Sequence, residues 1–274
     1  MMKLGIFAKT FAGSSPEVVL GAAARAGFPA VQYNMACSGI GALPEVVPDA
    51  VALAVRQASL ESGVQIVGLS ATYNMIHPDM AQREAGRRSF AGLAAQARAM
   101  GTGLLTVCTG SADAGDPWRH HPDNQSPAAW AAMMAEFGYL TEIAERHDVL
   151  IGVEPELANV VDGAASARRL LDSLGSDRVR IVLDPANLAE VATSDERRRI
   201  IATAVDLLAD RLVMAHAKDR SAAGGFATAG KGVIDFPHFI GCLKAVGYDG
   251  PLVTHGLAEP EAALVAAFLS GLLR

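Results

Sequence analysis

The feature that most constrains the fold is a regular alternation of eight short apolar runs with eight longer amphipathic segments. The apolar runs lie at 4–8, 30–34, 65–70, 104–109, 150–154, 180–184, 212–216 and 252–255. The amphipathic segments lie at 16–26, 48–62, 81–100, 127–147, 164–174, 195–209, 236–246 and 259–273. Most of the short runs are continuously apolar, which is typical of parallel strands that are buried on both faces. The sequence therefore predicts eight parallel strands, each followed by a helix.

This rhythm predicts a parallel sheet with right-handed crossovers. Eight units in 274 residues, without a linker between them, favour one closed (β/α)8 barrel of the TIM type that forms a single domain over residues 1–274. A doubly wound open sheet is the alternative, and the absence of a GxGxxG motif after the first run weakens it. Ser15 before Pro16 and Ser126 before Pro127 are good helix starts, because serine can cap the first turn and proline fits it.

Charge and composition exclude several classes of partner. The chain has 29 Asp and Glu against 23 Lys and Arg, a formal charge of −6, so it would repel nucleic acid and anionic lipid. No run reaches the roughly 20 apolar residues that a membrane-spanning helix needs. Three scattered cysteines without a CxxC pair indicate reduced thiols, so we predict a cytoplasmic protein with no nucleic-acid or membrane partner. The alanine-rich outer helices could pack against a second copy, which leaves a homo-oligomer open.

Polar side chains stand at the carboxyl ends of the predicted strands, where a barrel of this type places its active site. They are Asn34, Ser70, Glu154, Asp184, His216 and His255. The last four come from four successive strands and are hard or borderline ligands for a divalent ion. Two carboxylates without a cation would force one of them to take up a proton, and a bound metal removes that repulsion. Any one of these side chains could be structural, but the four together predict a metal site.

At this point the sequence resembles a known family, the sugar phosphate isomerase/epimerase group of xylose-isomerase-like TIM barrels. The segments that carry the resemblance are IGVEPE at 151–156, IVLDPANL at 181–188, VMAHAKD at 213–219, GKGVIDF at 230–236 and GYDGPLV at 247–253. The resemblance covers nearly the whole chain. It implies a divalent ion, Mn, Zn, Co or Mg, with Glu154, Asp184 and His216 as its ligands by position.

The chain departs from the family's pattern at two positions. Epimerases of the family carry a glutamate on strand eight that binds metal and serves as the second acid/base, and here this position is His255. The family often has a histidine three residues after the strand-six aspartate, and here this position is Asn187. A neutral imidazole can still bind metal, so a site of two carboxylates and two histidines is expected, with zinc or manganese favoured over magnesium.

Isomerising or epimerising a sugar requires the removal of a proton next to a carbonyl that the metal can polarise. Glu154 is one candidate base, provided that it keeps a free oxygen as a ligand. Glu156 is another, although it could equally be an exposed carboxylate at the rim. His255 could act as acid or base if it does not bind the metal.

Two long loops, 110–125 and 217–234, follow predicted strands and are expected at the same end of the barrel. Trp118 could form an apolar wall for a sugar ring, and Arg119 and His120 could bind hydroxyls or phosphate, unless this loop tip is simply solvated.

Three further side chains are candidates for substrate binding. Asn74 and His77 follow strand three, although His77 before Pro78 could be a helix-entry residue. Lys218 could bind a substrate oxygen or pair with Asp219 or another acidic residue at the rim.

These features favour a metal-dependent isomerase or epimerase whose partner is a small-molecule sugar, sugar phosphate or polyol. An inosose-dehydratase-like lyase would use the same scaffold. A metal-dependent hydrolase is a further alternative, although such enzymes usually need more than one metal. A non-catalytic sugar-binding barrel is the last alternative, because fold alone does not decide function.

Overall fold

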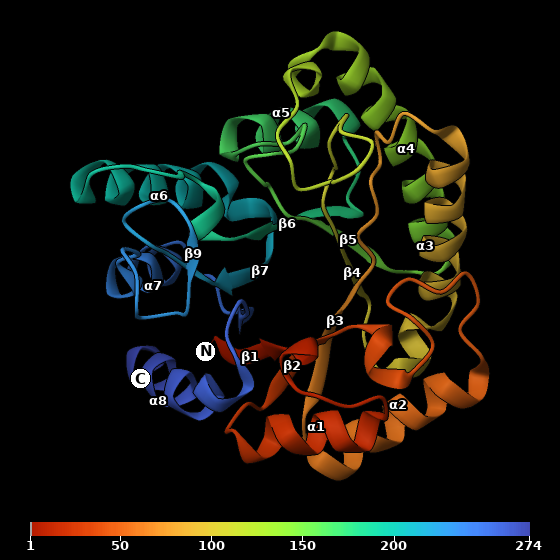
Figure 1. The fold of residues 1–274 in the computed structure, drawn as a ribbon, viewed down its shortest axis with the longest axis vertical. Helices are drawn as coiled ribbons and strands as arrows, with labels where there is room; N and C mark the ends of the chain where they lie inside the picture. Colours follow the sequence, from red (N-terminus) through yellow and green to blue (C-terminus); the bar gives the residue numbers. More distant parts are fainter. Residues whose placement is uncertain (1) are drawn as a thin grey trace.

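The computed structural model describes residues 2–274 and forms a closed barrel of eight parallel strands inside a ring of eight α-helices (Figure 1). The barrel strands are β1 (Lys3–Phe7), β2 (Ala30–Tyr33), β3 (Gln65–Ser70), β4 (Leu104–Val107), β5 (Leu150–Val153), β6 (Val179–Leu183), β7 (Leu212–Ala217) and β10 (Pro251–Thr254). The helices are α1 (Pro16–Arg25), α2 (Asp49–Ser62), α3 (Met80–Met100), α4 (Pro127–Arg146), α5 (Ala164–Leu174), α6 (Ser194–Leu208), α7 (Phe236–Ala245) and α8 (Ala262–Leu273).

Strand pairing closes the sheet. The order around the barrel is β1-β10-β7-β6-β5-β4-β3-β2, and every neighbouring pair is parallel. The first strand pairs with the last, from Lys3 opposite Pro251 to Ile6 opposite Thr254. The predicted (β/α)8 barrel is therefore confirmed, and the doubly wound sheet is ruled out because an open sheet has two edge strands, whereas each of these eight strands pairs with two neighbours.

The helix starts predicted from the sequence are present. Ser15 Oγ accepts a hydrogen bond from the Val18 amide, and Ser126 Oγ accepts one from the Ala129 amide. Several helices end at a glycine in the left-handed region, such as Gly175 with a φ of 59°, where a side chain would be strained. These local signals fix where the chain leaves each helix and enters the next strand.

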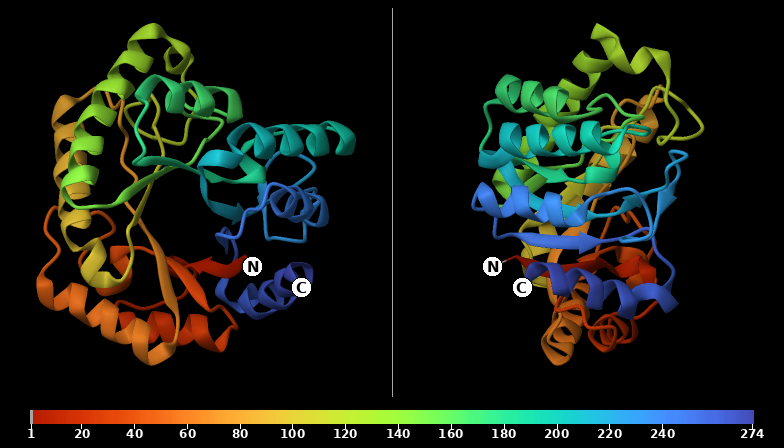
Figure 2. Two further views of the ribbon diagram at one scale, coloured as in Figure 1. Left: turned by 180° about the vertical axis from the view of Figure 1, so that it is seen from behind. Right: turned by 90° about the vertical axis from the view of Figure 1, so that its left-hand side faces the viewer.

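The loop predicted at 217–234 contains secondary structure of its own. It contains a short antiparallel hairpin, β8 (Asp219–Arg220) with β9 (Phe226–Ala227). Strands of two residues are too short to show a periodic pattern, so the sequence did not reveal them. Seen from the side, this hairpin and the loop after β4 project beyond the same end of the barrel (Figure 2).

The opposite end of the barrel interior is filled by apolar side chains. Leu104, Val182, Met214 and Val253 form a buried cluster contributed by β4, β6, β7 and β10. Space for this cluster comes from glycines on the intervening strands: a Cβ on Gly152 would lie 2.8 Å from Val182 Cγ2 and 3.1 Å from Leu104 Cδ1. This cluster forms an apolar floor beneath the carboxyl ends of the strands.

The tight packing at Gly152 gives a first prediction. Gly152→Ala is expected to lower the free energy of unfolding by about 1–3 kcal/mol, because the added methyl group overpacks the barrel interior. The matched control is Gly138→Ala on the exposed face of α4, where a Cβ meets no atom within 4 Å. This control should raise the free energy of unfolding by about 0.5–1 kcal/mol through helix propensity. Denaturant titration of both variants measures the difference, and equal effects would contradict the packing argument.

Within residues 2–274, none of the helices combines the length and the apolar character needed to cross a bilayer.

Candidate metal centre and cavity

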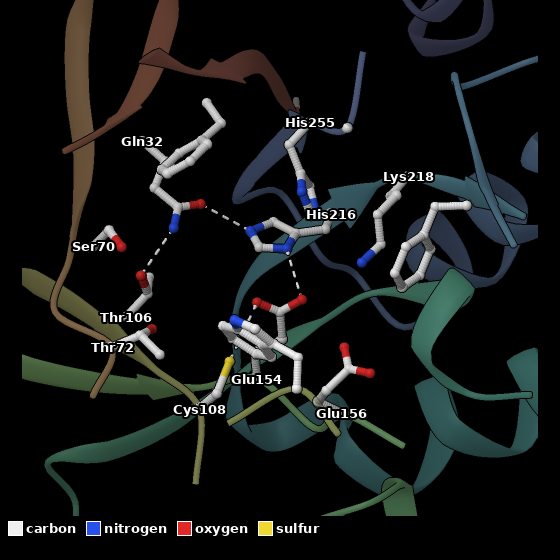
Figure 3. Close-up of a pocket in the computed structure, with 14 residues that line it drawn as sticks. Gln32, Ser70, Thr72, Thr106, Cys108, Glu154, Glu156, His216, Lys218 and His255 are labelled. Carbon is white, nitrogen blue, oxygen red and sulfur yellow. Dashed lines mark hydrogen bonds and ion pairs between the residues drawn. The ribbon is translucent and has the colours of Figure 1, made fainter. Parts of the chain in front are cut away.

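A cavity of about 400 Å³ opens at the carboxyl ends of the barrel strands (Figure 3). Its lining consists of Phe7, Gln32, Ser70, Thr72, Thr106, Cys108, Trp118, Glu154, Glu156, His216, Lys218, Phe226, His255 and Gly256. Most of these side chains belong to barrel strands or to the residue or two that follow them. The position agrees with the general placement of active sites in barrels of this kind.

The two-residue period of a strand explains which side chains reach the cavity. Met214 belongs to the apolar cluster below, His216 lines the cavity, and Lys218 lines it two residues further on. Glu154 and Glu156 follow the same rule above the inward position of Gly152 on β5. Side chains at alternate positions face one side of the sheet, so each strand contributes a column of inward residues.

Four side chains converge at one side of the cavity. Glu154, Asp184, His216 and His255 each offer one ligand atom, and these atoms all lie within 4.8 Å of one another. His216 Nδ1 is 3.2 Å from Glu154 Oε1 and 4.0 Å from Asp184 Oδ2. His255 Nε2 is 3.2 Å from the same Asp184 oxygen. The structure thus brings together the four residues that the sequence predicts as metal ligands.

The donor set fits a divalent ion. Ligand atoms that are each about 2.0–2.2 Å from one ion lie roughly 3–4.4 Å from one another, close to the separations seen in the cluster. Two carboxylate oxygens and two imidazole nitrogens suit zinc or a similar transition metal. The cluster could therefore hold a metal ion.

Hydrogen bonds outside the cluster orient its carboxylates. Asp184 Oδ1 accepts from the Ala186 amide at 2.9 Å, which leaves Oδ2 to face the two histidines. Asn187 Nδ2 donates to Glu154 Oε1 at 2.9 Å. Asn187, at the position where the resembling family often has a histidine, therefore contacts a member of the cluster.

The charges in the cluster stabilise one another. Burial opposes the ionisation of both acids, but attraction to His216 lowers the pKa of Glu154, and attraction to Lys218 and the histidines lowers the pKa of Asp184. Burial likewise opposes protonation of His216, yet the neighbouring Glu154 raises the pKa of this imidazole. For His255 burial prevails and its pKa is lowered. The carboxylates are thus kept in the ionised form that binds a cation.

Lys218 and Glu156 lie beside the cluster. Lys218 Nζ is 3.5 Å from Asp184 Oδ2 and 3.7 Å from the ring centre of Phe226, which covers it from the β8–β9 hairpin. Lys218 therefore forms an ion pair with Asp184. From the sequence, the candidate partner was Asp219 or another acidic residue at the rim. Glu156 lines the cavity, where burial raises the pKa of its carboxyl to about 7 although Lys218 acts in the opposite direction.

The hairpin that carries Phe226 is held by one buried carboxylate. Asp219 accepts hydrogen bonds from the backbone amides of Arg220, Gly230, Gly232 and Ile234. A Cβ on Gly232 would lie 2.4 Å from Asp219 Oδ1, so this close approach needs glycine. The GKGVIDF segment thus builds a cradle of amides around Asp219.

The remaining predicted binding residues lie in different places. Trp118 lines the cavity. Asn74 forms two hydrogen bonds with the backbone of Ser111 in the neighbouring loop: its Nδ2 donates to the Ser111 carbonyl oxygen and its Oδ1 accepts from the Ser111 amide. His77 Nε2 is 3.1 Å from the Ala114 carbonyl oxygen. Arg119 pairs with Asp113 at 3.2 Å.

His120 is exposed at the tip of the same loop. The side chains of Asn74, His77, Arg119 and His120 are therefore outside the cavity lining.

Sequence reasoning missed several residues that line the cavity. Gln32, Thr106 and Cys108 are buried side chains on or just after β2 and β4, and Phe7 ends β1. Counting two residues back from Asn34, the end of the predicted strand 30–34, reaches Gln32. Thr106 cannot be found in this way, because the predicted strand 104–109 ends at Thr109 and alternate positions back from it are 107 and 105.

Comparison with known proteins agrees with this architecture. The sequence profile described as "Xylose isomerase-like TIM barrel" matches residues 20–269. A search of curated proteins finds no match. Among solved structures, the apo form of 3-keto-D-glucoside 4-epimerase from E. coli has a TM-score of 0.78 at 18% identity, covering 99% of both chains.

Two other epimerases are similar in fold. D-allulose 3-epimerase from Methylomonas sp. has a TM-score of 0.75 at 18% identity, covering 99% of this chain and 98% of its own. D-psicose 3-epimerase from Clostridium cellulolyticum H10 has a TM-score of 0.77 at 14% identity, covering 100% of both chains. The profile match over most of the sequence, with the closed barrel, shows that this chain belongs to the xylose isomerase-like TIM barrel family.

Proposed function

We propose that this protein is a metal-dependent sugar isomerase or epimerase that removes a proton next to a carbonyl group. The observation that carries the proposal is the convergence of Glu154, Asp184, His216 and His255 at one side of a cavity that also holds a separate carboxylate, Glu156. Structural neighbours that are sugar epimerases support the same class of reaction. The expected partner is a small-molecule sugar, sugar phosphate or polyol.

The four clustered residues would hold the ion, and two imidazoles among them favour zinc or manganese. When bound, a divalent ion supplies Lewis-acid activation of a carbonyl oxygen. The cavity has apolar walls formed by Phe7, Trp118 and Phe226, against which the C–H groups on one face of a sugar ring can pack. Lys218 would donate a hydrogen bond to a substrate oxygen from its place beside Asp184.

In this proposal, two carboxylates transfer the proton. Glu156 faces the cavity and is not part of the cluster, so it is free to take a proton from a substrate carbon. Glu154 uses Oε1 towards His216, while Oε2 lies 4.0 Å from the thiol of Cys108. We assign the base to Glu156, with Glu154 as the second group that can exchange a proton through Oε2.

Solvent exchange tests this function directly. The manganese-loaded protein should incorporate deuterium from D2O into at least one compound of a panel of ketoses and inosose-like compounds, as measured by NMR. Glu156→Gln should slow the exchange by about 10²–10⁴-fold, the usual contribution of a general base, while Mn²⁺ still binds. Glu142→Gln, an exposed change on α4, is the matched control and should exchange like the wild type.

Different outcomes would reassign the function. Exchange that survives in Glu156→Gln but is lost in Glu154→Gln, with Mn²⁺ still bound, would move the base to Glu154. Loss of water from an inosose-like compound would indicate the lyase. Absence of exchange across the panel in a protein that binds Mn²⁺ would contradict proton abstraction from these compounds and leave the hydrolase or the non-catalytic barrel.

A further inference from the structure

We infer that Gln32 is a positioning residue that fixes the His216 imidazole with its Nδ1 lone pair directed at the metal cluster. This inference deepens the proposed function and rests on it, because it concerns the same metal site. Gln32 is on β2, which is not a neighbour of β7 in the barrel, so the contact crosses the barrel interior. Figure 3 shows the line of hydrogen bonds from Thr106 through Gln32 to His216.

A backbone carbonyl at one end of this line determines which atom donates and which accepts in each hydrogen bond. Leu69 O can only accept, and it lies 3.3 Å from Thr106 Oγ1, so the threonine hydroxyl donates its single proton there. Thr106 Oγ1 is then an acceptor for Gln32 Nε2, which donates to it at 2.9 Å. The amide group of Gln32 is thereby oriented with its oxygen towards β7.

The orientation of Gln32 determines the tautomer of His216. Gln32 Oε1 is 2.8 Å from His216 Nε2, and an amide oxygen can only accept, so Nε2 carries the proton. Nδ1 lies 3.2 Å from Glu154 Oε1, and it donates a hydrogen bond to this carboxylate when it carries a proton. In the neutral imidazole that would bind a metal ion, the proton on Nε2 leaves the lone pair on Nδ1. The reverse amide orientation would place NH2 against Nε2 and leave Nδ1 to carry the proton, which would block it as a ligand.

Burial makes this arrangement strict. Gln32, Thr106 and His216 are all buried, and buried polar groups are almost always hydrogen-bonded. Removing the Gln32 oxygen would leave the Nε2 proton facing apolar atoms, so the ring would lose its preference for the orientation that binds metal. Loss of such a partner typically weakens metal binding by about 10–100-fold.

The experiment compares four full-length variants by calorimetric titration with Mn²⁺. Gln32→Met removes the acceptor at nearly constant length and should weaken binding about 10–100-fold. Gln32→Glu keeps an oxygen for Nε2 and should bind within about threefold of the wild type, since carboxylate partners of metal-bound histidines are common. Thr106→Val allows the Gln32 amide to rotate, so the affinity of this variant for Mn²⁺ should lie between those of Gln32→Met and Gln32→Glu. Gln57→Met, on the exposed face of α2, should bind like the wild type.

A second readout concerns the ring itself. In the zinc-loaded wild type, NMR of ¹⁵N-histidine-labelled protein should show a slowly exchanging Nε2 proton for His216, which Gln32→Met should lose and Gln32→Glu should retain. Binding of Mn²⁺ by Gln32→Met with wild-type affinity would overturn the inference. A loss in Gln32→Glu as large as that in Gln32→Met would also overturn it, because Gln32 would then act by packing alone. Failure of the wild type to bind Mn²⁺ would overturn the metal-dependent function, and this inference with it.

Discussion

Asp184→Asn is expected to abolish metal binding and all activity that depends on it, while leaving the local backbone in place. Asp184 Oδ1 accepts from the Ala186 amide, and an asparagine oxygen can keep this bond. The new NH2 group then occupies the position of Oδ2. That atom faces His255 Nε2 at 3.2 Å and Lys218 Nζ at 3.5 Å. A ligand atom is thus replaced by a donor that repels both a metal ion and the ammonium group.

Thermal unfolding with and without Mn²⁺ measures this loss. A metal present at 100 times its Kd stabilises the folded protein by about 2.7 kcal/mol, which corresponds to a rise in Tm of roughly 5–10 °C for a protein of this size. Asp184→Asn should show no such rise. Its Tm without metal should also fall, because buried Lys218 loses the partner of its ion pair.

Asp206→Asn on the exposed face of α6 is the matched control and should respond to Mn²⁺ like the wild type. A rise in Tm in Asp184→Asn equal to that of the wild type would remove Asp184 from the metal site. A wild type that shows no rise at any Mn²⁺ concentration would contradict the metal site as a whole.

The barrel and the four clustered residues could be predicted because parallel strands impose their own geometry. All strands of a closed parallel barrel end on one rim, so the last residues of the successive barrel strands β5, β6, β7 and β10 must approach one another whatever the details of packing. Glu154, Asp184 and His255 directly follow such strands, and His216 is the next-to-last residue of β7. Identifying strand ends in the sequence was therefore sufficient to place them in one site.

The other parts of the site cannot be predicted from each strand by itself, because they depend on how the strands and loops are arranged relative to one another. The contact between Gln32 and His216 joins residues 184 positions apart across the barrel, and only the register of all strands brings them together. Asn74 and Arg119 are in loops whose conformation is set by their own hydrogen bonds to neighbouring loop residues, and these turn the side chains away from the cavity. Polar composition alone cannot show the direction of such side chains.

Asp219→Asn is expected to cause the largest loss of stability outside the metal cluster. Oδ1 accepts from the amides of Arg220 and Ile234, and Oδ2 accepts from those of Gly230 and Gly232, at 2.8–3.0 Å. Whichever way the new amide group points, two backbone N–H groups will face its NH2. Leaving two such donors without an acceptor costs up to about 2–6 kcal/mol, more for the buried amides of Arg220 and Ile234 than for the part-buried amides of Gly230 and Gly232.

The resulting fall in Tm should be roughly 5–20 °C, measured against Asp249→Asn, an exposed change with no expected effect. The hairpin that carries Phe226 starts at Asp219, so the loss should also loosen the cover over Lys218. In the sugar-exchange assay this would raise KM more than it lowers kcat, because Phe226 lines the cavity as a proposed apolar wall for the substrate and has no group that can move a proton. A Tm within about 2 °C of the wild type would show that the amide cradle can rearrange around an asparagine, and that the carboxylate is not what holds the hairpin.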